Sequence, residues 1–217
     1  MAMQVPVIYD NGLQRRFSLG DLFATFEPIP PATDTTNTTL AVTAAMVLSP
    51  IYVRNPAGVS TDTYPTADAL ITALQSNYGT QSIPTGLSFR WRVINLSANL
   101  ITGAVTANTG VTMTRGNILA STTKDFQINI TNGTPTVTAA NVGSTNGSAV
   151  LTGFTATQLA TMSVGQQMIT STANLQGQTI IVINLGAGTV TMSGNANATQ
   201  SQTMTFSPTY TITGLAA

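Results

Sequence analysis

The sequence predicts an all-β protein, mainly of antiparallel β-sandwich or β-barrel units, with one or two short helices and an extended N-terminal arm. The chain is rich in Thr, whose branched Cβ suits pleated strands, and in Gly and Asn, which suit turns. Short strand-like segments, such as LSFRWRVIN, GVTMTRG and KDFQINIT, are separated by Asn, Gly and Ser. Only 6% of the residues are charged, against roughly 25% in an average soluble domain. Hydroxyl and amide groups, rather than ions, therefore solvate the expected surface.

Residues 1–50 are predicted to form the arm, because Pro28, Pro30 and Pro31 disfavour regular strand pairing. The segment SLGDLF could begin one helical turn, with Ser18 as its cap. Several side chains are too apolar for a purely solvated tail: Val5, Val7, Ile8, Leu13, Phe17, Leu22, Phe23 and Phe26. The arm is expected to dock on a neighbouring subunit, and a disordered N-terminus is the alternative.

Residues 51–135 are predicted to form a first β domain with a helix over about 66–76. Apolar residues recur there at the spacing of one helical face: Ala67, Leu70, Ile71 and Leu74. Thr66 suits the helix cap, and Asp68 in the first turn suits the helix dipole.

Residues 140–217 are predicted to form a second β unit with a short helix over about 155–162. Thr155 and Gln158 match the pattern of a capping box. The segments QTIIVINL, GTVTMSG, QTMTFSP and TYTITG are expected to be the strands of this unit.

The single tryptophan, Trp91, lies between two arginines in the segment SFRWRVIN. Strict alternation places Trp91 with Phe89 and Val93 on one face, and Arg90 and Arg92 on the other. A single-stranded nucleic-acid site needs stacking aromatics and cations on the same face. The segment therefore predicts a core strand, and the balanced charge of seven basic and seven acidic residues argues against a nucleic-acid partner.

The composition argues against an enzyme. Without His or Cys, the common nucleophile–base pairs and thiolate metal sites cannot be built, so neither a metal nor a cofactor is expected. No phosphate-binding loop or calcium loop is present in the sequence. No signal peptide is recognised at the N-terminus, and the most apolar window is too short to span a membrane, so no membrane partner is expected.

Two segments, YVRNPAGVSTDTYPTADALITAL and FRWRVINLSANLITGAVTANTGVTMTRGNILASTTKDFQINITN, resemble a pattern in virion structural proteins of tailed bacteriophages. In that pattern a strand, a Pro-Thr-Ala helix, an aromatic-rich strand ending in Ile-Asn and a Thr- and Gly-rich hairpin follow one another. The resemblance covers about residues 51–135 and is to the capsid decoration, or cement, type. The pattern carries no catalytic motif. Arg115 and Asn117 stand in its hairpin, where small residues are expected.

The resemblance implies a homotrimer that binds the major capsid protein on the outside of the capsid, after assembly in the host cytoplasm. Interface contacts are expected from Arg15, Arg16, Phe17, Phe23, Arg90 and Arg92, although solvated surface arginines are an equal alternative. Two other functions remain open: a tail-fibre or receptor-binding module and a self-assembling extracellular filament subunit. A receptor-binding module would use exposed aromatic residues, for which the candidates are Tyr52, Tyr64, Tyr78 and Tyr210.

Overall fold

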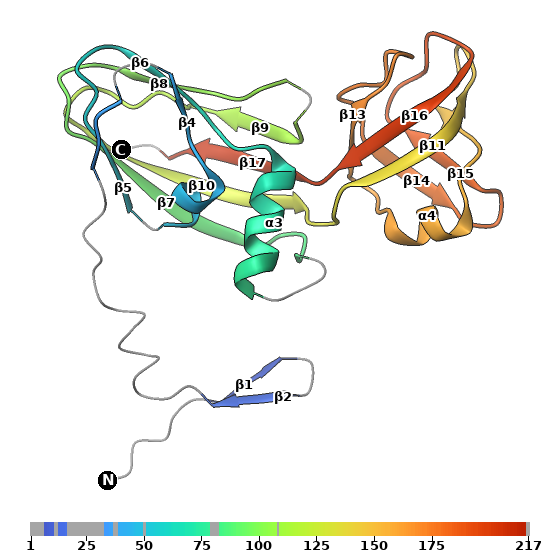
Figure 1. Ribbon diagram of the computed structural model, residues 1–217, viewed down its shortest axis with the longest axis horizontal. Coiled ribbons are helices and arrows are strands. Elements are labelled where there is room, and N and C mark those ends of the chain that lie inside the picture. The colour runs from blue at the N-terminus through green and yellow to red at the C-terminus, as the bar shows by residue number, and fades with distance from the viewer. Residues whose placement is uncertain are drawn as a thin grey trace. The chain divides into compact units, whose positions relative to one another are not determined.

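The computed structural model describes residues 7–10, 13–16, 33–36, 39–49, 51–78, 83–107 and 109–215. The chain divides into two compact units, Met1–Ala32 and Thr33–Ala217. In the first unit, strands β1 (Val7–Asp10) and β2 (Leu13–Arg16) form an antiparallel hairpin (Figure 1). Asn11 and Gly12 connect them in the sequence, and Asn-Gly is a favoured pair for a two-residue hairpin connection.

The second unit consists mostly of strands, which confirms the predicted all-β class. It contains two separate hydrophobic cores. We call the described residues within 33–132 and 209–215, which surround the first core, the first lobe, and residues 137–207 around the second core the second lobe. Three short helices lie among the described residues, one more than the sequence suggested.

The first lobe contains a six-stranded sheet and a three-stranded sheet. The larger sheet has the order β3 (Thr33–Asp34), β5 (Ile51–Arg54), β7 (Ser88–Asn95), β10 (Thr123–Asn132), β17 (Thr209–Gly214) and β9 (Val111–Thr114). The smaller sheet has the order β4 (Leu40–Ala41), β6 (Ser60–Thr63) and β8 (Ile101–Ala104). Among the described strands of this lobe, β10 pairs in antiparallel fashion with β7 and with β17, and the other ladders are parallel.

An aromatic cluster joins the two sheets of the first lobe. The ring of Trp91, on β7, lies 5.7 Å from that of Tyr64 and 5.6 Å from that of Phe126, measured between ring centroids. Trp91 is 1% exposed and Arg90 and Arg92 are exposed, so the predicted alternation of this strand is confirmed.

Helix α3 (Ala67–Tyr78) packs on the same core through the apolar face that the sequence predicted. Thr66 Oγ1 accepts a hydrogen bond from Ala69 N at 3.2 Å, which confirms the helix cap. The Tyr210 hydroxyl of β17 donates to Pro65 O at 2.7 Å, just before the helix. The N-terminus of the helix is therefore held both by its cap and by β17 of the six-stranded sheet.

The second lobe has two three-stranded sheets of antiparallel ladders. One has the order β11 (Val137–Ser144), β16 (Gln200–Ser207) and β13 (Gln167–Thr170). The other has the order β12 (Val150–Leu151), β15 (Thr189–Met192) and β14 (Ile180–Asn184). Helix α4 (Ala156–Thr161) begins with the predicted capping box, in which Thr155 Oγ1 accepts from Gln158 N and Gln158 Oε1 accepts from Thr155 N.

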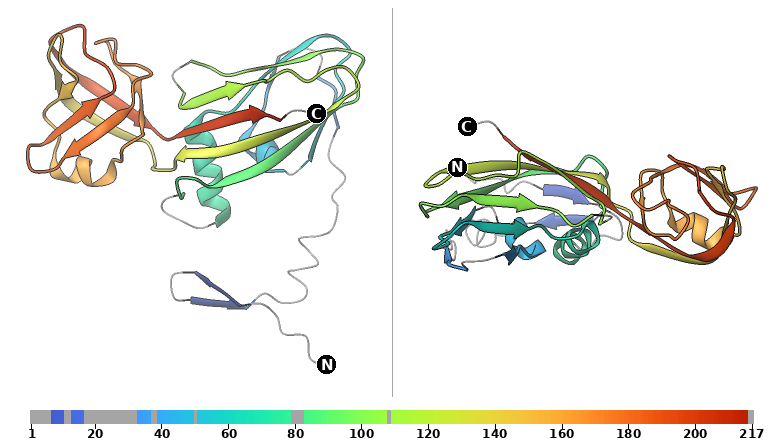
Figure 2. Two further views of the ribbon diagram at one scale, coloured as in Figure 1. Left: turned by 180° about the vertical axis from the view of Figure 1, so that it is seen from behind. Right: turned by 90° about the horizontal axis from the view of Figure 1, so that it is seen from above.

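The last strand differs from the sequence-based grouping of residues 140–217. Strand β17 pairs with β10 in the first lobe, so the second lobe is inserted between these two neighbouring strands. Figure 2 shows the red β16–β17 segment running from one lobe into the other. Alternation alone predicts that TYTITG is a strand, but it carries no information about which sheet the strand joins.

The C-terminal half of the predicted arm also differs from the prediction. Strands β3 and β4 and helix α2 (Ala44–Leu48) belong to the first lobe, and Val42 and Val47 are buried in its core. The predicted helical turn at Ser18 lies outside the described residues. The separate unit therefore ends at residue 32 rather than near residue 50.

Candidate functional site

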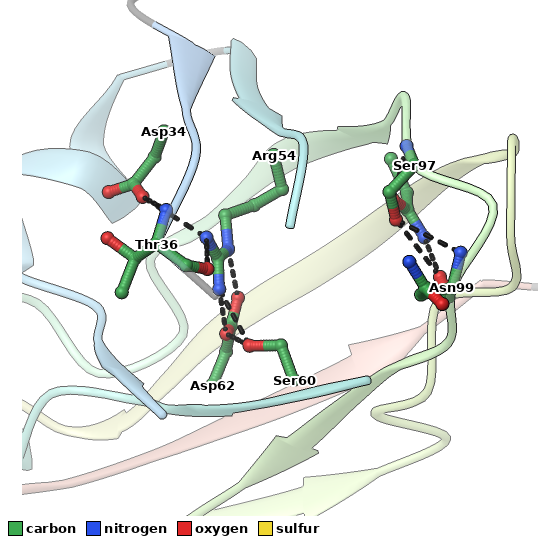
Figure 3. Close-up of polar contacts among 8 residues, drawn as sticks. Asp34, Thr36, Arg54, Ser60, Asp62, Ser97 and Asn99 are labelled. Carbon is green, nitrogen blue, oxygen red and sulfur yellow. Dashed lines mark hydrogen bonds and ion pairs between the residues drawn. The ribbon is translucent and has the colours of Figure 1, made fainter. Parts of the chain in front are cut away.

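A buried arginine, Arg54, lies at the centre of an ion cluster in the first lobe (Figure 3). Its Nε donates to Asp62 Oδ2 at 2.9 Å and its Nη2 to Asp62 Oδ1 at 2.7 Å, a bidentate pair. Nη2 also donates to Ser60 Oγ at 2.7 Å, while Nη1 donates to Asp34 Oδ1 at 3.1 Å and Thr36 O at 2.9 Å. A guanidinium has five N–H donors, and all five have partners here.

Three strands from the two sheets of the first lobe contribute side chains to this cluster. Arg54 ends β5, Asp34 ends the neighbouring edge strand β3, and Asp62 lies on β6 of the other sheet. Burial raises the pKa of Asp34, but its hydrogen bonds from Thr36 and the charge of Arg54 outweigh burial and hold that pKa below its ordinary value. Burial lowers the pKa of Arg54, whereas the hydrogen bonds and charge of Asp62 raise it and prevail. Arg54 therefore joins β3 and β5 of the larger sheet to β6 of the smaller one through ion pairs.

The loops beside this cluster are tied together by the buried side chain of Asn95. Its Nδ2 donates to Asn99 O at 2.8 Å and to Leu119 O at 2.9 Å, and its Oδ1 accepts from Ser97 Oγ at 2.8 Å. Asn99 Nδ2 in turn donates to Pro56 O at 3.3 Å. Side-chain amides thus fix the loops at residues 55–59, 96–100 and 117–122 against one another. We call these three loops the loop tip.

The loop tip exposes one large apolar side chain from each of its loops. Val59 is 68% exposed, Leu96 57% and Leu119 64%. None of the residues in the three loops is charged. Ser121 has φ 52°, a left-handed conformation that is uncommon for serine, and Ser121 N donates to Ser97 O at 2.8 Å. Apolar side chains on firmly held loops are suited to contact with another apolar surface.

A second group of exposed apolar side chains lies on and around β14 in the second lobe. Val182 lies in register with Thr191 of β15, which lies in register with Val150 of β12, so these three residues form a row across the sheet. A register shift after Ile180 places Ile181 at an irregularity beside this row. We call the exposed members the β14 patch: Val150, Val164, Ile181, Val182 and Leu185.

An open hollow of about 710 Å³ lies between α4 and residues 134–138. Its lining carries Thr hydroxyls, the Gln158 amide and the apolar side chains of Val137 and Met162, and no ionisable side chain. It could accept a neutral polar group, but no aromatic platform for a sugar ring lines it. We therefore assign no chemistry to the hollow.

Of the predicted interface residues, Arg90 and Arg92 lie on β7 and belong to neither the loop tip nor the β14 patch. Arg92 Nε donates to Asp125 Oδ1 of its own chain at 2.7 Å, and Arg90 is exposed beside it on β7. Arg15 and Arg16 lie on β2, and their side chains are outside the described part of the chain. Phe17 and Phe23 fall outside the described residues altogether.

The tyrosine side chains that the structure describes are buried in the core. Tyr52 is 6% exposed, Tyr64 5% and Tyr210 1%, so none of these three offers a surface platform for a glycan. Tyr78 ends α3, and its side chain is not among those described.

Sequence reasoning missed Arg54 and the loop tip. Arg54 stands two residues after Tyr52 in the strand IYVR, so the strand period places both on one face, and a buried Tyr52 implies an inward arginine. That signal was present in the sequence. The exposure of Leu96 and Leu119 was not, because an apolar residue in a loop is equally compatible with burial.

Each carboxylate whose side chain is described takes part in a contact within the fold. Asp34 and Asp62 bind Arg54, Asp125 binds Arg92, and Asp68 accepts a hydrogen bond from Thr136 of the segment that leads into the second lobe. Within the described ranges, no three acidic side chains gather as a metal site would require.

Comparison with protein-family models, with curated proteins and with solved structures finds no match for this chain. Among the helices of the described segments, none has the length and apolar character needed to cross a membrane.

Proposed function

We propose that this protein is a non-enzymatic virion structural protein of the capsid decoration type, which binds the outer capsid surface as a homotrimer and stabilises the shell. The major capsid protein is the proposed partner. The resemblance of residues 51–135 to tailed-phage virion proteins motivates this assignment.

One observation carries the proposal: the carboxylates whose side chains are described are bound within the fold, and apolar side chains are presented on surfaces without charge. The described carboxylates hold elements of the fold together. The second lobe contains no charged side chain at all, yet exposes Val182 and Leu185. Surfaces of this kind suit protein–protein contact, and repetition on a shell multiplies weak contacts into firm attachment.

The test is binding to capsids that lack the protein. Purified protein is mixed with such shells over a range of ratios, and the pellet after sedimentation is analysed for stoichiometry and for the temperature at which the shells open. We expect saturable binding at a multiple of three copies per site and a higher opening temperature. Absence of co-sedimentation at every ratio would contradict the proposal.

A filament subunit is the second candidate, because β14 is an edge strand without charge that exposes Ile181 and Val182. Uncharged apolar edges favour strand addition between copies. An open-ended mass distribution that grows with concentration, together with no capsid binding, would favour the filament over the decoration protein.

A further inference from the structure

The exposed large apolar side chains of the described residues fall into two groups and one outlier. Three belong to the loop tip of the first lobe, and five to the β14 patch of the second lobe. The outlier is Ile51, at the start of β5 and 38% exposed. Solvation of these two groups is unfavourable, and covering both of them would release the water around them.

We infer that the loop tip of one copy packs against the β14 patch of a second copy, in a head-to-tail contact. This inference rests on the self-association included in the proposed function, and it names the two surfaces that associate. Because the two surfaces differ, the contact is heterologous, and repetition of the contact closes a ring or continues as a filament.

The topology of the first lobe keeps the two surfaces of one chain apart. The loop at 117–122 leads into the start of β10, whereas the second lobe follows the end of β10, at Asn132. A ten-residue strand spans about 33 Å. The loop tip therefore lies at the opposite end of β10 from the insertion, and its natural apolar counterpart is the patch of another copy.

Charge favours a second copy over anionic lipid or nucleic acid as the occupant. The residues of the loop tip carry no charge, and neither does any residue after Asp125. Anionic lipid or nucleic acid would require basic side chains around the apolar ones. Two uncharged surfaces meet without like-charge repulsion and without leaving a buried ion unpaired.

The loop tip is also rigid enough to bind without a large ordering cost. Asn95 holds the 96–100 and 117–122 loops together, and Leu96 N donates to Arg54 O at 2.8 Å, which joins the tip to the ion cluster beneath it. The side chains of Leu96 and Leu119 are thus presented on a fixed backbone. Preorganisation of this kind lowers the entropy lost on association.

The experiment compares two double variants of the full-length chain by light scattering across a dilution series. The tip variant is Leu96→Ser with Leu119→Ser, and the patch variant is Val182→Thr with Leu185→Ser. We expect the wild type to be an oligomer. For each variant we expect the apparent dissociation constant of self-association to rise at least tenfold, and the measured mass to fall to the 22.5 kDa of the monomer on dilution.

Mixing the two variants gives the sharpest readout. The tip variant keeps an intact patch and the patch variant keeps an intact tip, so an equimolar mixture is expected to form a heterodimer of twice the monomer mass that grows no further. A symmetric tip-to-tip or patch-to-patch contact would instead leave one variant self-associating and the mixture without a heterodimer, which would overturn the inference.

The control is Ile51→Thr, which removes an exposed apolar side chain outside both surfaces and should leave the oligomer unchanged. Near-ultraviolet circular dichroism of Trp91 reports whether each variant is folded, and Val59→Ser replaces the tip variant if it is not. A wild type that is monomeric throughout, or variants that associate like the wild type, would overturn the head-to-tail contact. Capsid binding by the wild type is measured separately, so the decoration proposal stands or fails on its own.

Discussion

At the scale of single residues, the buried Arg54 decides how the first lobe is held together. Its five donors reach two other segments, 34–36 and 60–62, so the ion cluster joins β5 to β3 of the same sheet and to β6 of the other sheet. Buried ion pairs often contribute little net stability compared with apolar packing, but removing one partner leaves the other charge buried and unpaired. The cluster is therefore sensitive to single substitutions.

Asp62→Ala is expected to destabilise the protein by about 3 kcal/mol, the lower end of the usual cost of breaking a buried pair, because Asp34 still faces Arg54. Urea denaturation followed by Trp91 fluorescence measures this loss. Asp125→Ala is the matched control, since its partner Arg92 has a side chain 51% exposed and the midpoint should barely change. Equal losses for the two variants would contradict the role given to burial.

Stability is expected to be nearly independent of pH between about pH 5 and pH 9, because the chain has no histidine. The pKa of Asp34 and that of Asp125 are lowered in the fold, so the stability they contribute is present above their unfolded pKa of about 3.9 and is lost as pH falls through the folded values. Burial raises the pKa values of Tyr64 and Tyr210, so their contribution is present below pH about 10 and is lost as pH rises through the folded values. Thermal midpoints measured from pH 2 to pH 11 test both limits, and a transition near pH 6.5 would contradict them.

At the scale of elements, local sequence signals predicted the short helix α4 well. The capping box of Thr155 and Gln158 is formed as the sequence suggested, and Leu159 on the inner face of the helix is buried. Such reciprocal caps satisfy backbone donors that a six-residue helix cannot satisfy internally.

Thr155→Ala is expected to cost about 1 kcal/mol by removing the N-terminal cap of α4. The loss should appear in the free energy of unfolding of the second lobe, which has its own core. Thr157→Ala, an exposed position in the same helix, is the control, and it should leave stability unchanged or slightly higher because alanine favours helix.

Strand β7 gives a second test at this scale. Trp91→Ala is expected to cost about 3–5 kcal/mol, because it empties the centre of the aromatic cluster between the sheets. Replacing Arg90 and Arg92 together by alanine should leave the thermal midpoint nearly unchanged, since both side chains point outward. Collapse of the transition in the arginine variant would contradict the register of β7.

At the scale of the whole molecule, the second lobe is an insertion whose two ends meet. Val137 of β11 lies in register with Phe206 of β16, and Asn132 of β10 lies in register with Thr209 of β17. Antiparallel neighbours of this kind can be joined by a short hairpin connection. The first lobe therefore has a complete sheet with or without the insertion.

Replacing residues 134–207 by two glycines is expected to leave the first lobe folded, with a lower midpoint because Asn132 loses its bonds to Ser163 and Val164. Gly133 is kept, because a Cβ there would lie 1.9 Å from Ile83 O. Circular dichroism and Trp91 fluorescence report the fold. An unfolded product would show that the first lobe depends on the second.

The sequence by itself determined the all-β class, the face of α3, the capping box of α4 and the inward side of β7. These features depend on residues close together in the chain, where strand and helix periods, caps and turns act locally. Only the tertiary structure decided that β17 belongs to the six-stranded sheet, that β3, β4 and α2 belong to the first lobe and that Arg54 binds carboxylates of two other strands. Those features depend on pairing between distant segments, which the period of a single strand cannot specify. The same holds for the loop tip and the β14 patch, because exposure of an apolar residue is set by what the rest of the fold places beside it.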